Sequence, residues 1–190
     1  MAPGRGLQVK LRLIKAYFDM EYVKVVFIRD HPSLPTPGGI INARRGDEIE
    51  LPRWQARLLE NEGYVEVRDP EIDIDFISRV HYNEVKKQAA NRLADVPPSF
   101  YRGVRELVEK IDRALLEKPS HMLVTDRESI ERLVLQIAQR RLSKMVRLAL
   151  TGSGGEVAGK LTPEEALVMK SLEDTVNAWN RFVSSLFERR

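Results

Sequence analysis

The chain has 190 residues, and its 31 Lys and Arg against 28 Asp and Glu leave a net charge of +3, too small an excess to indicate nucleic-acid binding by itself. With 43% hydrophobic and 31% charged residues, it has the composition of a folded protein rather than a disordered one. Because it has no cysteine and only three widely spaced histidines, we expect no disulfide, no thiolate metal site, no cysteine nucleophile and no histidine-based triad. No other residue pattern indicates a metal, a cofactor or catalytic residues.

The N-terminal region, residues 1–71, is expected to be a small β-rich domain. Residues 1–6 lack the apolar core of a signal peptide, and no run of 18 apolar residues occurs anywhere in the chain, so we expect a cytoplasmic protein without membrane contact. Residues 7–18 are compatible with either a strand or a short helix. After them the sequence predicts strands at 22–28, 40–42, 48–51 and 64–67, a proline-rich loop at 31–39, and a helix that starts at Pro52 and stops at Gly63.

The C-terminal region, residues 72–190, is expected to be a helical bundle, joined to the first domain at Asp69-Pro70-Glu71. It carries the whole net charge of +3, because residues 1–71 hold 11 basic and 11 acidic side chains. Apolar periodicity and capping signals predict four helices, at 74–93, 98–117, 125–150 and from 162 onward. The fold class is therefore α+β, a small β-rich domain followed by a mainly α-helical bundle, with a flexible loop at 151–160.

The third predicted helix carries a basic cluster, formed by Arg140, Arg141, Lys144 and Arg147. Positions 140, 144 and 147 share one helical face, so the cluster could contact DNA phosphates weakly or could be a solvated helix face. Proteins that bind single-stranded nucleic acid use aromatic side chains to stack on the bases, and none is interleaved with these cations. A stand-alone DNA-binding protein that uses residues 140–147 is one alternative function.

A glycine-rich stretch follows, and residues 154–162 nearly match a phosphate-binding loop. The motif needs a hydroxyl directly after its lysine, but Leu161 follows Lys160 and Thr162 comes one residue late. We therefore favour a linker between two helices over a nucleotide-dependent enzyme. In the last helix, Phe182 and Phe187 lie partly off the main apolar stripe, which makes them candidates for a partner-facing surface.

Two stretches of the chain resemble a known family. Residues 46–60 (GDEIELPRWQARLLE) together with 63–67 (GYVEV) resemble the small B domain of archaeal GINS subunits. The helical region resembles the GINS A domain, through residues 141–147 (RLSKMVR) and 161–165 (LTPEE). The resemblance covers about residues 10–188, and its B-then-A order marks the subunit related to the eukaryotic Psf-two and Psf-three proteins.

This resemblance implies a non-enzymatic scaffold subunit of the GINS DNA replication complex. It implies assembly with an A-then-B subunit into a two-plus-two heterotetramer, which links the MCM helicase to a RecJ-like or Cdc-like partner at nucleoid replication forks. Because GINS assemblies bury A-domain helices between subunits, it also implies that two apolar stripes form the subunit interface. Their members are Tyr101, Val104, Val108, Ile111, Leu172, Val176, Trp179, Phe182, Val183 and Phe187. Segment 140–147 recurs in the family, which favours a structural or interface role over DNA contact.

Overall fold

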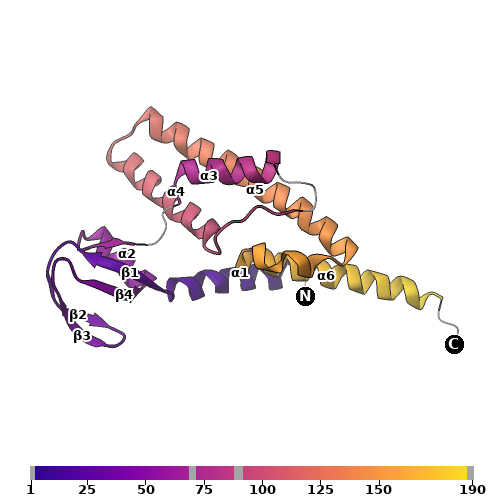
Figure 1. Ribbon diagram of the computed structural model, residues 1–190, viewed down its shortest axis with the longest axis horizontal. Coiled ribbons are helices and arrows are strands. Elements are labelled where there is room, and N and C mark those ends of the chain that lie inside the picture. Colours follow the sequence, from indigo (N-terminus) through magenta and orange to yellow (C-terminus); the bar gives the residue numbers. More distant parts are fainter. Residues whose placement is uncertain (1–2, 69–71, 88–91, 188–190) are drawn as a thin grey trace. The chain divides into compact units, whose positions relative to one another are not determined.

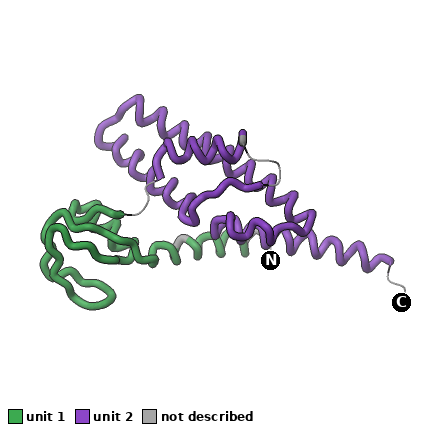
Figure 2. The backbone as a smooth tube through the Cα atoms, viewed as in Figure 1, with its two compact units in different colours: residues 1–70 green, residues 71–190 purple. Residues whose placement is uncertain are grey.

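The computed structural model describes residues 3–68, 72–87 and 92–187. The chain divides into two units, residues 1–70 and residues 71–190, which Figure 2 shows in different colours. The predicted joint at residues 69–71 lies outside the described residues. The first unit contains strands and two helices, and the second is helical (Figure 1), so the predicted α+β class is confirmed.

The centre of unit 1 is a three-stranded antiparallel sheet with the order β4-β1-β5. Its strands are β1 (Tyr22–Phe27), β4 (Glu48–Pro52) and β5 (Val65–Val67). Along β1, Val23, Val25 and Phe27 are buried and alternate with more exposed residues, as period-two side-chain geometry requires. Helix α2 (Arg53–Asn61) adds Ala56 and Leu59 to this core. It is followed by Gly63, whose φ of 73° fits the predicted left-handed stop.

A separate hairpin in unit 1 replaces the predicted proline-rich loop. Residues 31–39 were expected to be irregular, yet β2 (His31–Thr36) pairs antiparallel with β3 (Gly39–Ala43). The prediction is wrong because each strand of a two-stranded sheet has one edge that pairs with no other strand. A proline whose nitrogen faces that edge costs the sheet no hydrogen bond. An irregularity between His31 and Leu34 accommodates Pro32, and Leu34 is buried in the core.

The ambiguous N-terminal segment is a helix, α1 (Pro3–Asp19). Leu7, Leu11, Ile14 and Phe18 recur at spacings of four and three along one side of it, as in an amphipathic helix. Phe18 is buried, and the Arg53 guanidinium lies 4.1 Å from the centre of its ring. The backbone N–H of Arg53 also donates to the carbonyl of Glu21, so the end of α1 adjoins the start of α2.

Unit 2 begins with a helix that is shorter than predicted. The sequence predicts one helix over 74–93, whereas α3 (Ile74–His81) passes into a π-helical turn, η1 (Tyr82–Lys87). Residues 92–98 are not helical, and residues 88–91 lie outside the described part of the chain. Helices α4 (Phe100–Glu117) and α5 (His121–Thr151) complete a core with α3, in which Ile77, Phe100 and Ile130 are buried.

One of the two predicted capping boxes exists. Helix α5 starts at His121, four residues before the predicted start, and the Thr125 hydroxyl donates to the His121 carbonyl from inside the helix. The box at the start of α6 (Pro163–Ser185) is confirmed. There the Glu165 backbone N–H donates to the Thr162 hydroxyl, and the Thr162 N–H donates to the Glu165 carboxylate.

The expected flexible loop at 151–160 is instead a 3-10 helix, η2 (Gly154–Lys160). Its Val157 is buried against side chains of α5 and α6, including Met145, Leu148 and Met169. Gly154 packs so closely that a Cβ placed on it would clash with the Glu173 carboxylate and with the methyl group of Met169. None of the described helices is long and apolar enough to cross a membrane.

Candidate functional site

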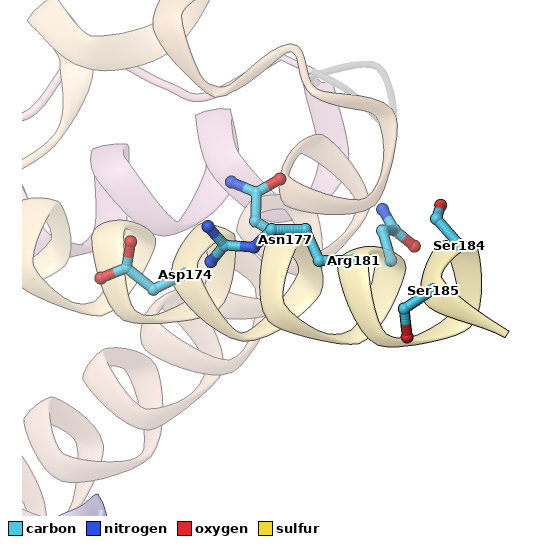
Figure 3. A pocket seen from close by; sticks show the side chains of 6 residues that line it. Asp174, Asn177, Arg181, Ser184 and Ser185 are labelled. Carbon is cyan, nitrogen blue, oxygen red and sulfur yellow. The ribbon is translucent and has the colours of Figure 1, made fainter. Parts of the chain in front are cut away.

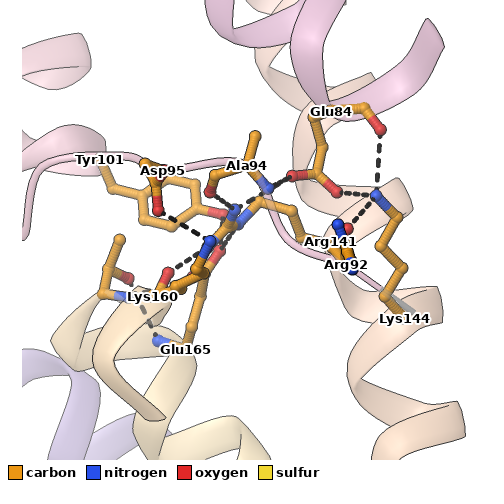
Figure 4. Close-up of polar contacts among 10 residues, drawn as sticks. Glu84, Arg92, Ala94, Asp95, Tyr101, Arg141, Lys144, Lys160 and Glu165 are labelled. Atoms are coloured by element: carbon orange, nitrogen blue, oxygen red, sulfur yellow. Dashed lines mark hydrogen bonds and ion pairs between the residues drawn. The ribbon is translucent and has the colours of Figure 1, made fainter. Parts of the chain in front are cut away.

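The guanidinium of Arg141 is fully buried in unit 2, and its side chain is 0% exposed. Figure 4 shows it among groups from several segments of the chain, including Glu84, Ala94, Tyr101 and Glu165. Its Nε and Nη2 donate to the two Glu165 oxygens, at 2.6 and 2.7 Å. Its Nη1 donates to the Glu84 carboxylate (3.1 Å) and to the Ala94 carbonyl (2.8 Å), and Nη2 also donates to the Lys160 carbonyl. All five N–H donors of the guanidinium are therefore satisfied.

Lys144 lies one turn further along α5 and is 1% exposed. Its ammonium group donates to the Glu84 carboxylate, to the Glu84 backbone carbonyl and to the Arg92 carbonyl, which uses its three protons. Glu84 is itself fully buried in η1 and also accepts from the backbone N–H of Ala94. Arg141, Lys144, Glu84 and Glu165 thus carry two positive and two negative charges, and the buried network is neutral.

Glu165 is the acidic group that ties α6 to this network. Its Oε1 accepts from the Tyr101 hydroxyl of α4 at 2.8 Å and from Arg141, while its Oε2 accepts from Arg141 and from the Thr162 N–H. Beside it, Arg102 of α4 pairs with Glu164 at 3.3 Å. The network therefore joins α4, α5, α6, η1 and η2, and it fixes how α6 leaves the bundle.

Two pKa values in the network are displaced. Burial, and then the charge and hydrogen bond of Glu165, raise the pKa of the Tyr101 phenol far above its usual range. For Arg141, burial acts to lower the pKa, but the hydrogen bonds and charge of Glu165, together with the charge of Glu84, outweigh it and raise the pKa. Both shifts favour a neutral Tyr101 and a charged Arg141.

Above about pH 10 we expect Tyr101 to make the protein less stable as pH rises. An unfolded tyrosine ionises near pH 10, whereas folded Tyr101 keeps its proton, so unfolding releases a proton and becomes easier at higher pH. The free energy of unfolding should lose up to about 1.4 kcal/mol per pH unit from this group. Urea unfolding between pH 9 and 11 should show a steeper loss for the natural chain than for Tyr101→Phe. Equal slopes would contradict the assignment.

The structure corrects the predicted basic contact surface. Arg141 and Lys144 were candidates for contact with DNA or a partner, but both are buried in ion pairs and cannot reach a ligand in this fold. Of the other two cations of the cluster, Arg140 is half-buried and Arg147 is exposed. The cluster is therefore mainly an internal structural element, and it does not form a continuous basic stripe.

The phosphate-loop resemblance has no matching geometry. A phosphate loop follows a strand, whereas Gly154–Lys160 follows α5 and is itself a 3-10 helix. The Lys160 ammonium is 3.2 Å from Asp95 at the surface, and the Lys160 carbonyl accepts from Arg141. Within the described residues, no cluster of three or more His, Cys, Asp or Glu side chains is arranged to hold a metal ion.

The apolar stripe predicted on α4 faces the interior of unit 2. Val104 and Ile111 are buried in its core, which corrects their assignment to a subunit interface. Tyr101 and Val108 are partly buried against the same core, and Leu172 of α6 packs on a second one. These residues hold the bundle together, and this leaves the C-terminal half of α6 as the exposed part of the predicted interface.

Four large side chains on that half, or in the turn directly after it, are between 57% and 80% exposed: Trp179, Phe182, Leu186 and Phe187. The ring centres of Trp179 and Phe182 lie 5.9 Å apart. Val176 and Val183 are partly exposed on the same side of the helix. Leu186 was not among the residues predicted for the subunit interface, although it is 64% exposed. We call these six residues the α6 apolar face.

The α6 apolar face continues a coiled-coil spacing that begins inside the unit. Met169, Leu172, Val176, Trp179, Val183 and Leu186 follow one another at intervals of three and four residues. Met169 is buried and Leu172 is half-buried against the unit's own core, whereas Trp179 and Leu186 are exposed. The apolar spacing therefore continues into the part of α6 that no other segment of unit 2 buries.

A shallow polar pocket lies along this half of α6, and Figure 3 shows the side chains that line it. Its described lining is Asp174, Asn177, Asn180, Arg181, Ser184 and Ser185. All six come from one helix, which presents side chains to one side only, so the pocket does not enclose a small ligand.

Comparison with known proteins identifies the helical unit. Residues 71–181, more than half of the chain, match the family model Sld5, described as the GINS complex protein helical bundle domain. The match includes the whole buried network and stops inside the α6 apolar face, before Phe182. A search of curated proteins found no match.

Proposed function

Since this chain belongs to the GINS family, a non-catalytic family of the DNA replication machinery, we propose that it is the archaeal subunit in which the small domain precedes the helical one. GINS proteins work as hetero-oligomers with other GINS subunits. We propose that the partner here is an A-then-B subunit, in a two-plus-two heterotetramer at replication forks in the cytoplasm. The assembly would link the MCM helicase to a RecJ-like or Cdc-like protein.

The order of the two units supports the B-then-A assignment. The strand-rich unit, residues 1–70, comes first, and the family match begins at residue 71, at the start of the helical unit. Unit 1 has the size and strand content expected of the small domain, with β1, β4 and β5 around α2. An A-then-B subunit would show the reverse order.

The observation that carries the proposal is the α6 apolar face. Three aromatic side chains and one leucine, each more than half exposed, form the kind of patch that marks a protein interface. Tryptophan is enriched among the residues that dominate binding energy, and Trp179 lies near the middle of this face. The buried network then acts as a positioning device, because Glu165 anchors the start of α6 to α4 and α5.

Native mass spectrometry tests the assembly. Co-expression of this chain with an A-then-B GINS subunit should produce a species with two copies of each. If only monomers, or homo-oligomers of this chain, are found, the subunit assignment fails. Mixing the purified tetramer with MCM helicase and a RecJ-like protein should give one co-eluting complex in gel filtration. A tetramer that binds neither protein would contradict the linking role alone.

A further inference from the structure

A second unpartnered apolar stripe lies on α1, in unit 1. Val9, Leu13 and Tyr17 recur at spacings of four, which places them on one side of the helix, and Met20 follows in the turn directly after it. Their side chains are between 56% and 76% exposed. The opposite side carries Leu7, Leu11, Ile14 and Phe18, which are half-buried or buried. The exposed stripe is therefore not the surface by which α1 attaches to the fold.

Positive charge borders this stripe on both sides. Lys10 follows Val9 and Arg12 precedes Leu13, so the two cations fall on opposite flanks of the apolar positions, and both are exposed. In coiled-coil terms, Val9 and Leu13 take core positions, and Lys10 and Arg12 take the flanking positions that select a partner by charge. The helix sequence contains four basic residues and only one acidic residue, Asp19 at its end.

We propose that α1 is a docking helix for an acidic amphipathic helix of another protein. The partner presents its own apolar stripe to Val9, Leu13 and Met20, and its Glu or Asp side chains pair with Lys10 and Arg12. This inference is independent of the α6 apolar face, because it concerns another unit and a different charge pattern. It gives the chain a second binding surface, in addition to the α6 apolar face that we propose for the assembly with other GINS subunits.

Two other occupants fit the observations less well. In a pair of α1 helices from two copies of the chain, the flanking cations of one copy would meet those of the other, and like charges at these positions repel. A helix that lies on an anionic membrane needs a strongly polar side opposite its apolar one. Here the opposite side carries Leu7, Leu11, Ile14 and Phe18. An acidic helix satisfies both the apolar stripe and its basic borders.

Titration of the full chain with two synthetic three-heptad peptides tests this proposal. Both peptides carry Leu at the core positions, and one has Glu and the other Lys at the flanking positions. Fluorescence anisotropy should show binding of the Glu peptide, weakened by raising the salt from 0.1 to 0.5 M, and little binding of the Lys peptide. Lys10→Glu with Arg12→Glu should weaken Glu-peptide binding about tenfold.

A matched control separates local charge from net charge. Arg44→Glu with Arg45→Glu changes the net charge of unit 1 equally, at exposed positions of the turn before β4, and should leave peptide binding unchanged. Leu13→Ser should abolish binding without altering the circular dichroism of the chain. The proposal is overturned if both peptides bind equally or the control weakens binding as much. It is also overturned if Leu13→Ser abolishes a homodimer, or vesicle binding, rather than peptide binding.

Discussion

Replacing Arg141 with methionine is expected to lower the free energy of unfolding of the helical unit by about 3–5 kcal/mol. Methionine occupies a similar volume, but Glu165 loses the guanidinium that donates to both of its oxygens. Glu84 keeps Lys144 as its one remaining cationic partner in the network. An excess carboxylate charge in a site that excludes water is costly, since neither solvent nor another cation is there to balance it. Urea unfolding followed by far-ultraviolet circular dichroism measures the loss.

Two further variants distinguish the buried charge from a general effect of substitution in α5. Arg147→Met, on an exposed position of the same helix, should change the stability by no more than about 0.5 kcal/mol. Arg141→Met combined with Glu165→Met should be less destabilised than Arg141→Met alone, because the remaining Lys144–Glu84 pair is neutral. If Arg141→Met matches Arg147→Met, the network does not stabilise the unit as described.

Substituting Trp179 and Phe182 together by alanine should weaken binding of the A-then-B subunit at least about 100-fold, equivalent to about 3 kcal/mol. Both rings lie in the α6 apolar face and touch each other, so they present one continuous surface to a partner. Because the rings are more than half exposed in the single chain, the folding of unit 2 should change little. Isothermal titration calorimetry measures the affinity, and circular dichroism verifies the fold.

The control for this pair lies on the same half of the same helix. Asn177→Ala with Ser184→Ala alters the polar side of α6 and should leave the affinity within about threefold of the natural value. If the two double variants weaken binding equally, the effect comes from the helix as a whole rather than from its apolar face. If neither weakens binding, α6 is not the subunit interface.

Local patterns predicted most of the secondary structure. Strand β1 follows from a run of β-branched residues, and the start of α6 follows from the reciprocal Thr162–Glu165 cap, because each depends on neighbours in sequence. Strand β2 was missed because its prolines indicate a loop. Its pairing with β3 depends on the tertiary structure, which local sequence patterns do not show. The early start of α5 was missed because Thr125 offers a capping signal that the helix does not use.

The positions of the buried cations could have been recognised from their spacing in the sequence, although their charge suggests exposed residues. Ile137, Arg141, Lys144 and Leu148 keep the spacing of a core stripe, and all four are buried. On the same helix Leu142 and Val146 are apolar but exposed, so hydrophobicity alone does not identify the buried side. Basic residues at core spacing thus mark positions where a buried carboxylate must be present, although they do not say which one.

The sequence by itself determined the α+β class, the family resemblance and the apolar repeat along the last helix, because these depend on composition and on residues a few positions apart. Tertiary structure alone decided which charges are internal and which apolar side chains remain uncovered. Arg141 finds Glu165 24 residues away and Lys144 finds Glu84 60 residues away, distances over which periodicity carries no information. Likewise, the same spacing in α6 is covered at Met169 and bare at Trp179, because burial depends on what the rest of the fold places beside it.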